Sequence, residues 1–215
     1  MNVLNILIAF FIAYILGSIP SAVWFGKLFH GIDVREHGSG NAGTANTIRV
    51  LGLKTGIPVL IVDLGKGWLA AMLPHFFSLA PSESAMLINF QIITGLAAII
   101  GHIFPVFAGF RGGKGVATVF GVLLAIHPGV TLVCLAVFLV ILILTGIVSV
   151  SSMSAGIAFP ILLLTIFDTP SLAFKIFSVI VAIALLITHH NNIKRLLKGE
   201  EKKLFQKKPK VQESE

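Results

Sequence analysis

Seven long runs of apolar residues limit this chain to a narrow class of folds. The runs cover residues 3–25, 54–76, 85–108, 116–127, 130–148, 153–168 and 171–189. A helix needs about 20 mostly apolar residues to cross the hydrocarbon core of a bilayer, and most of the runs come close to this length. The runs lack the alternation of membrane strands, so the sequence predicts an all-α integral membrane protein with seven transmembrane helices. Only 12% of the residues are charged, about half the usual share in soluble proteins.

The fourth run, 116–127, is short, and its separation from the fifth decides the topology. A helix over this run would rise only about 18 Å. Merging it with 130–148 would instead give a helix of about 50 Å, well beyond a hydrocarbon core of about 30 Å. His127-Pro128-Gly129 is also a strong turn signal. We therefore expect two separate helices here.

Basic residues divide the connecting segments into two sets. Cations gather after the first and third runs and at the C-terminus, where eight of the sixteen basic residues fall between Lys194 and Lys210. The connections after the second, fourth and sixth runs carry no lysine or arginine. Because basic segments stay in the cytoplasm, the sequence predicts an outer N-terminus and a cytoplasmic C-terminus.

The same charge pattern predicts two parts of the chain, a membrane domain over 1–193 and a basic cytoplasmic tail over 194–215. A lysine-rich composition predicts that the tail is flexible. Its cations suit the anionic headgroups of membrane lipids. No nucleic-acid partner is expected, because Phe205 is the only aromatic residue available for stacking in the tail.

Three polar segments interrupt the apolar sequence, and the predicted topology places all three on the cytoplasmic side. The first contains Gly38-Ser39-Gly40-Asn41-Ala42-Gly43-Thr44 and continues to Arg49. Its glycine spacing matches a dinucleotide-binding loop, but that motif needs a preceding strand, and here a transmembrane helix precedes it. Glycines do let backbone N–H groups approach an anion closely. We predict an anion-binding loop.

The second segment is Arg111-Gly112-Gly113-Lys114-Gly115. It is not a P-loop, because glycine follows the lysine where serine or threonine would be needed, and no strand precedes it. It still offers backbone N–H groups, a lysine charge and the start of a helix near Val116, a combination that suits a phosphate. We expect Lys114 to be essential and Arg111 to be a topological anchor.

The third segment is His189-His190-Asn191-Asn192, at the inner end of the last run. His189 and Asn192 share a helical face because they are three residues apart. A metal site built from His37, His102 and His189 is conceivable, but no carboxylate or cysteine accompanies them at ligand spacing. We therefore predict no metal.

Two features inside the apolar runs need separate interpretations. Asp63 and Lys66 lie three residues apart, which predicts an ion pair inside the membrane that holds the packing, with a direct substrate role as the alternative. Cys134 is the only cysteine and lies in an apolar run, so we expect a small buried residue, not a nucleophile.

The order and spacing of these motifs resemble the bacterial membrane family of acyl-phosphate:glycerol-3-phosphate acyltransferases, the PlsY family. The matching pieces are Gly17-Ser18-Ile19-Pro20-Ser21, residues 38–46 with Arg49, residues 101–118, and His189 with Asn192-Ile193-Lys194-Arg195-Leu196. The resemblance implies a seven-helix enzyme with a cytoplasmic site and no cofactor. It implies acyl transfer from acyl phosphate to the 1-hydroxyl of glycerol 3-phosphate, giving lysophosphatidate and phosphate. This is the first acylation of phospholipid synthesis, and an enzyme that forms acyl phosphate would be a functional partner.

The resemblance also implies roles for individual residues. The pocket for the phosphate of acyl phosphate would comprise Ser39, Gly40, Asn41, Gly112, Gly113, Lys114 and Gly115, with Thr44 nearby. The glycerol 3-phosphate site would comprise Arg49, Lys114, His189 and Asn192. A serine from Ser149, Ser151 and Ser152 would join it, with Ser152 as the first choice. Lys114, His189 and Asn192 would be the catalytic group, and either His189 or a bound phosphate would accept the hydroxyl proton. We hypothesise that His189 mainly positions substrate.

Two other functions fit parts of the sequence. A transporter for a small anion would use Asp63 and Lys66 as gating groups, but transporters place their sites at mid-membrane and often carry internal repeats, which we do not find. A transferase for an isoprenoid phosphate would need metal-binding aspartates, and Asp33 and Asp63 stand alone. No histidine is followed five positions later by aspartate, so the signature of thioester-using acyltransferases is also missing.

Overall fold

The computed structural model describes residues 3–82, 84–167, 169 and 171–205. Within these residues the regular structure is entirely helical, with two short 3₁₀ turns at Val34–Glu36 and Val106–Ala108. The α-helices are α1 (Val3–Gly17), α2 (Ser21–His30), α3 (Thr44–Leu51), α4 (Leu53–Phe76), α5 (Ala85–Ile103), α6 (Val116–Ile126), α7 (Pro128–Thr145), α8 (Val148–Thr165), α9 (Leu172–Thr188) and α10 (His190–Leu197).

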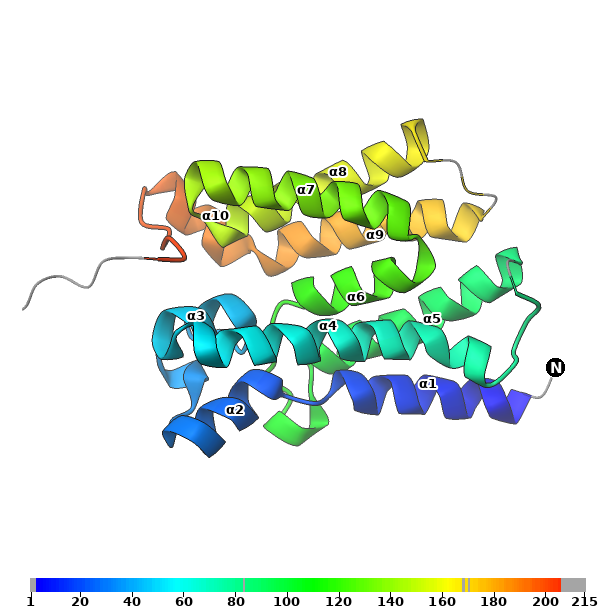
Figure 1. Ribbon diagram of the computed structural model, residues 1–215, viewed down its shortest axis with the longest axis horizontal. Helices are drawn as coiled ribbons and strands as arrows, with labels where there is room; N and C mark the ends of the chain where they lie inside the picture. Colours follow the sequence, from blue (N-terminus) through cyan, green and yellow to red (C-terminus); the bar gives the residue numbers. More distant parts are fainter. Residues whose placement is uncertain (1–2, 83, 168, 170, 206–215) are drawn as a thin grey trace, which may run out of the picture.

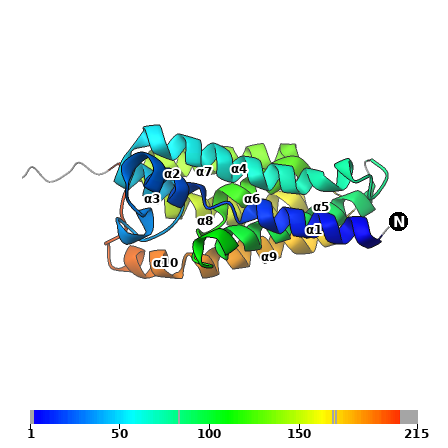
Figure 2. The ribbon, with the colours of Figure 1, turned by 90° about the horizontal axis from the view of Figure 1, so that it is seen from below.

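The long helices lie side by side along the long axis of the molecule (Figure 1). One group is formed by α1, α4 and α5, and a second by α7, α8 and α9. Helix α6 lies between the groups and packs most extensively against α4. The short helices α2, α3 and α10 gather at the end of the bundle away from the N-terminus, as both views show (Figures 1 and 2).

The predicted helical membrane class is confirmed. Each of the seven apolar runs contains a helix, and five segments are long and apolar enough to cross a membrane: Val3–His30, α4, Ala85–Ala108, α7 and α8. Helices α9 and α10 form a sixth candidate that bends by 57°. Helix α6 is shorter, with 11 residues. The prediction that it is separate from α7 is correct, and the His127 side chain caps the start of α7 by accepting from the Val130 N–H at 3.4 Å.

Two helix boundaries differ from the prediction. The first run was expected to be one helix, but α1 ends at Gly17 and α2 begins at Ser21. Pro20 has no N–H group, so it cannot continue the hydrogen bonding of α1. The sixth run was expected to begin at 153, but α8 begins at Val148 because Gly146, with φ 70°, ends α7 early. All three candidate serines therefore lie in the first turns of α8.

The tail predicted over residues 194–215 begins inside helix α10, which continues to Leu197. Residues 198–205 continue from this helix and contact the polar loops, as described below. Residues 206–215 lie outside the described part of the chain, and the flexibility of the tail stays a prediction.

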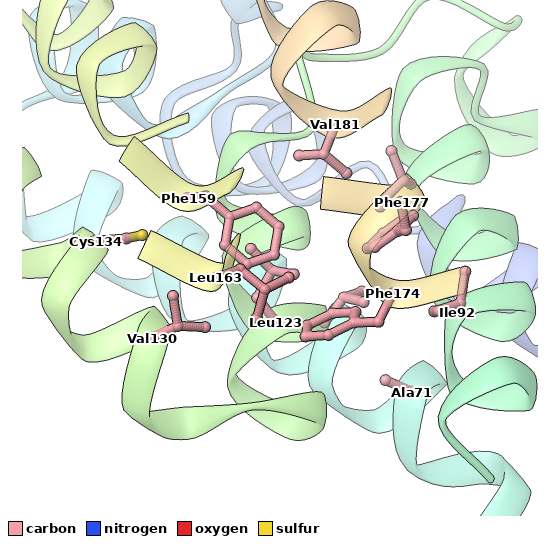
Figure 3. Close-up of a cluster of buried hydrophobic side chains, with 12 residues drawn as sticks. Ala71, Ile92, Leu123, Val130, Cys134, Phe159, Leu163, Phe174, Phe177 and Val181 are labelled. Atoms are coloured by element: carbon pink, nitrogen blue, oxygen red, sulfur yellow. The ribbon is translucent and has the colours of Figure 1, made fainter. Parts of the chain in front are cut away.

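The core joins six helices around the aromatic rings of α8 and α9 (Figure 3). Phe159 and Phe174 are fully buried and meet edge to face. Cys134 is buried beside this cluster, as predicted. The core therefore fastens the second group of helices to α6, which is too short to be held by the bilayer alone.

Helix α6 approaches α4 through glycines. A Cβ atom at Gly67 would collide with the backbone carbonyl of Thr118, and one at Gly121 with the carbonyl of Leu64. Small residues allow this kind of close backbone contact between membrane helices.

We predict that Gly67→Ala destabilises the protein by about 1–3 kcal/mol, because the added methyl group must push α6 away. Gly65→Ala is the matched control on the same helix, since a Cβ there meets no atom within 4 Å. It should be neutral or slightly stabilising. Thermal unfolding in detergent measures both, and equal midpoints for the two variants would contradict the packing argument.

Candidate functional site

The three polar segments line one large cavity of about 790 Å³. Its polar lining comes from both glycine loops, the start of α8 and the junction of α9 with α10, and also includes Asp63, His102 and Glu201. Of the predicted site residues it includes Ser39, Gly40, Asn41, Thr44, Arg49, Lys114, Gly115, Ser152, His189 and Asn192. The remainder of the cavity runs between α6, α7, α8 and α9 and is apolar, lined by Phe120, Leu123, Cys134, Leu135, Phe138, Leu139, Phe159, Val181 and Leu185. One chamber therefore joins cationic loops to a long hydrocarbon-like channel.

The first loop owes its shape to Asn46. This buried side chain accepts hydrogen bonds from the backbone N–H and the hydroxyl of Ser39, at 2.7 and 3.1 Å. Its amide donates to the carbonyls of Val34 and His37, at 2.8 and 3.1 Å. Gly38 and Gly40 take positive φ angles of 65° and 72°, which glycine adopts without strain. The loop is thus fixed from within before any ligand binds.

Arg35 ties the first loop to the second but does not line the large cavity. Its guanidinium donates to the Ala108 and Arg111 carbonyls at 2.8 and 3.1 Å and to the Asp33 carboxylate at 2.7 Å. This hydrogen bonding lowers the pKa of Asp33 to about 2. Arg35 therefore holds the two loops together. His37, which follows in the same segment, is exposed.

The second loop is anchored to the end of α5. The Gly112 and Gly113 N–H groups donate to the carbonyls of Ile103 and His102 at 3.0 and 3.1 Å. These two glycines line a small neighbouring cavity, whereas Lys114 turns into the large one. Arg111 is exposed and lines neither. The structure thus separates the two cations of this loop.

Lys114 reaches across the cavity to the third segment. Its ammonium donates to the side-chain oxygen of Asn192, Oδ1. The side-chain NH₂ group of Asn192 in turn donates to the Glu201 carboxylate at 2.5 Å. Glu201 also accepts from Ser149 at 2.8 Å and from Arg195 at 2.6 Å. Sequence reasoning missed Glu201, because it lies in a basic tail with no periodicity. The signal available was a Glu200-Glu201 pair among lysines.

Residues 198–205 run beside this network, and Glu201 and Leu204 line the cavity. Arg49 donates to the backbone carbonyls of Lys202 and Lys203 at 3.1 and 3.2 Å. The Lys202 ammonium donates to the Gly38 carbonyl at 3.1 Å, and the Leu204 N–H to the Gly146 carbonyl at 2.8 Å. The tail therefore joins the first polar loop to the α7–α8 turn.

Burial shapes the charges of this network. Removal from water lowers the pKa of Lys114 to about 8, and the nearby cations Arg195 and Arg49 lower it further against the attraction of Glu201. Burial alone would raise the pKa of Glu201, but hydrogen bonds from Arg195, Asn192 and Ser149 hold it below its ordinary value. Glu201 is therefore a carboxylate and Lys114 an ammonium near neutral pH.

His189 ends α9 with its imidazole buried. Its Nδ1 atom lies 2.8 Å from the Leu185 carbonyl oxygen, which can only accept. Nδ1 therefore carries the proton, and the Nε2 atom of a neutral ring keeps a lone pair for an O–H donor. His190, by contrast, is exposed.

The three serines of α8 have different surroundings. Ser149 and Ser152 line the large cavity, and Ser149 is bonded to Glu201. Ser151 donates to the Ile147 carbonyl within its own helix at 2.9 Å and does not line the cavity. Among the described residues, no group of three or more histidine, cysteine, aspartate or glutamate side chains lies close enough to hold a metal ion.

Comparison with known proteins gives one consistent result. A family model described as glycerol-3-phosphate acyltransferase matches residues 7–199. The glycerol-3-phosphate acyltransferase of Listeria monocytogenes is 44% identical over 203 residues, which cover 94% of this chain and 98% of that protein. The protein of the same name from Chlorobaculum tepidum is 42% identical, with 90% and 94% covered.

Two solved structures have the same fold. Both are crystal structures of PlsY (YgiH), described as an integral membrane glycerol 3-phosphate acyltransferase. The glycerol 3-phosphate form has a TM-score of 0.81 at 36% identity. The lysophosphatidic acid form has a TM-score of 0.78 at 35% identity. Each alignment covers 92% of this chain and 94% of the other.

We predict that Glu201→Gln lowers the free energy of unfolding by about 1.5–3 kcal/mol, because a charged hydrogen-bond acceptor is lost while Arg195 stays in place. Thermal unfolding in detergent measures this loss as a fall in the midpoint temperature of roughly 2–4 °C per kcal/mol. Glu200→Gln is the matched control, since Glu200 is exposed. A Glu201→Gln midpoint equal to that of the control would show that the network contributes nothing.

We also predict that phosphate binding weakens as the pH rises through about 8, where Lys114 loses its proton. A bound anion favours the ammonium, so saturating phosphate should move this loss to higher pH. Lys114→Arg should bind with no such loss up to pH 10, because the guanidinium stays charged. Titration with inorganic phosphate at a series of pH values tests this, and identical profiles for the two proteins would rule out Lys114 as the titrating group.

Proposed function

Because the chain belongs to the glycerol-3-phosphate acyltransferase family, we propose that its cavity transfers a fatty acyl group from acyl phosphate to the 1-hydroxyl of glycerol 3-phosphate. The products are lysophosphatidate and inorganic phosphate. The observation that carries this proposal is the single chamber in which two cation-bearing loops open into an apolar channel. Such a chamber fits two phosphates and one acyl chain. An enzyme that forms acyl phosphate supplies the donor.

The two phosphates bind on different walls. Ser39, Gly40, Asn41, Lys114 and Gly115 line the same cavity. They hold the phosphate of the donor, together with Gly112 and Gly113. Thr44 lies at the start of α3 beside this pocket. Backbone N–H groups and the Lys114 charge supply the attraction. The acyl chain then lies in the apolar channel.

Glycerol 3-phosphate binds on the opposite wall. Arg49, Lys114 and Asn192 hold its phosphate, and Ser152 and His189 hold its glycerol part. Lys114 contacts both substrates, so one cation screens the repulsion between two anions that must come together. The relatives and the solved structures carry glycerol 3-phosphate in their names, which supports this substrate.

The reaction needs no redox partner. The 1-hydroxyl oxygen attacks the acyl carbon and forms the new ester bond, and the bond from that carbon to the phosphate oxygen breaks. Phosphate leaves with the bonding electron pair and accepts the hydroxyl proton. His189 orients the hydroxyl through its Nε2 lone pair. Phosphate is a good leaving group, so the protein contributes mainly position and charge.

We infer seven membrane crossings, with the N-terminus outside and the cavity on the cytoplasmic side of a bacterial inner membrane. Helices α3 and α10 lie at the end of the bundle away from the N-terminus (Figure 1), as an odd number of crossings requires. Helix α6 is the short crossing and lies between α4 and α7. The basic residues of α10 and the tail favour the cytoplasmic side.

The direct test uses purified protein with glycerol 3-phosphate and palmitoyl phosphate in a metal-free buffer. We expect stoichiometric release of phosphate and lysophosphatidate. Palmitoyl-CoA in place of palmitoyl phosphate should give no product. Absence of phosphate release by folded protein would contradict the proposal. Uptake of labelled glycerol 3-phosphate into proteoliposomes, without acylation, would favour a transporter instead.

We predict that His189→Gln raises KM for glycerol 3-phosphate and leaves kcat within a few fold, because glutamine can still hydrogen-bond the hydroxyl. Steady-state kinetics at saturating glycerol 3-phosphate measure this. A loss of several orders of magnitude in kcat would instead identify His189 as the base.

A further inference from the structure

Four polar side chains meet inside the bundle, beneath the second polar loop. Ser21 begins α2, Asp63 and Lys66 belong to α4, and His102 belongs to the last turn of α5. Their exposed fractions are 2%, 1%, 4% and 6%. Ionisable groups inside a membrane helix are costly, and those that occur usually serve function.

The Asp63 carboxylate is the centre of this cluster. One oxygen, Oδ1, accepts from the Lys66 ammonium at 2.8 Å and from the Ser21 hydroxyl at 2.7 Å, and it lies 3.6 Å from Nδ1 of His102. Lys66 also donates at 2.8 Å to the Ile19 carbonyl, in the break between α1 and α2. The ion pair between Asp63 and Lys66 explains how α4 packs against the break between α1 and α2. It does not explain why the His102 imidazole lies next to the same Asp63 oxygen.

His102 connects the cluster to the phosphate loop in two ways. Its backbone carbonyl accepts from the Gly113 N–H at 3.1 Å. Its imidazole packs so closely on Gly113 that a Cβ there would overlap Nε2. The Ala42 carbonyl of the first loop would lie 3.1 Å from the same Cβ. Gly113 is therefore clamped between His102 and the first polar loop.

The clamp lies directly beside the phosphate loop. Asp63, His102, Gly112 and Gly113 share the small cavity behind the loop, and Asp63 and His102 also line the large cavity. Lys114 follows Gly113 directly and turns into the large cavity. A rotation of the imidazole would remove one wall of the clamp, and the loop could then move with Lys114. A displacement of about 1 Å at a substrate-binding group can cost on the order of 100-fold in rate.

We propose that Asp63 and His102 are positioning residues: Asp63 orients the His102 imidazole, and the imidazole holds Gly113 and Lys114 in place for the phosphate of the acyl donor. The assignment of that phosphate to this loop rests on the proposed function. Lys66 and Ser21 complete the Asp63 hydrogen bonding and fix the carboxylate.

The variant His102→Gln tests whether the imidazole positions the second loop. The matched control is His127→Gln, because His127 follows the end of α6 that is remote from this loop. We expect His102→Gln to lower kcat/KM for palmitoyl phosphate by roughly 10- to 100-fold and to change KM for glycerol 3-phosphate by less than about threefold. A purely structural role would lower the amount of active protein, which reduces apparent kcat and leaves both KM values unchanged. That outcome, or control-like kinetics, would overturn the proposal.

Asp63→Asn alone leaves the Lys66 ammonium buried without its counter-charge and is expected to unfold. The double variant Asp63→Asn/Lys66→Met removes both charges and should stay folded, because a buried ion pair can be replaced by neutral groups at little cost. We expect it to show the same donor-specific loss as His102→Gln. A folded double variant with wild-type kinetics would mean that Asp63 does not act through His102.

A binding measurement separates this proposal from the proposed reaction. Inorganic phosphate should raise the unfolding midpoint of the wild-type protein, and the same concentration should stabilise His102→Gln much less. If the wild type shows this effect but no acyl transfer, the reaction proposal fails and the positioning role stands. Equal stabilisation of both proteins, or none in the wild type, would overturn the positioning role whatever the activity.

Discussion

The cost of placing charge in hydrocarbon governs this structure, and the Lys114 ammonium carries that cost at the candidate site. Lys114 is partly buried, and its pKa is lowered to about 8 mainly by loss of water. It remains an ammonium because Asn192 accepts from it and Glu201 supplies a negative charge nearby. Both stabilising residues lie far from Lys114 in the sequence, Asn192 in α10 and Glu201 in the tail. Holding the cation therefore brings the second loop, α10 and the tail together.

The sequence predicted the helical membrane class, a helix within each of the seven apolar runs and the meeting of the polar segments, because these follow from the length of the apolar runs and from where the cations gather. The match of the family over residues 7–199 confirms the resemblance drawn from the motifs. The Asp63–Lys66 ion pair was predicted from spacing alone and is confirmed at 2.8 Å. These features are local or depend on simple periodicity.

Other features depend on contacts between distant residues and left no pattern to recognise. Glu201 joins the site from a segment whose composition predicted flexibility, and the Arg49 contacts to the same segment are equally non-local. The break between α1 and α2 was overlooked because the apolar run continues through it. His102 was noted only as a candidate metal ligand, and its contact with Gly113 depends on how α5 meets the second loop.

The proposed reaction requires that one cation, Lys114, serve both substrates. Acyl-transfer kinetics of Lys114→Met and Arg111→Met, with each substrate varied in turn, measure this requirement. We predict that Lys114→Met loses on the order of 100- to 1000-fold in kcat/KM for both palmitoyl phosphate and glycerol 3-phosphate, while the exposed Arg111 can be replaced with less than about threefold effect. A Lys114→Met enzyme impaired toward a single substrate, or one that keeps wild-type activity, would contradict it.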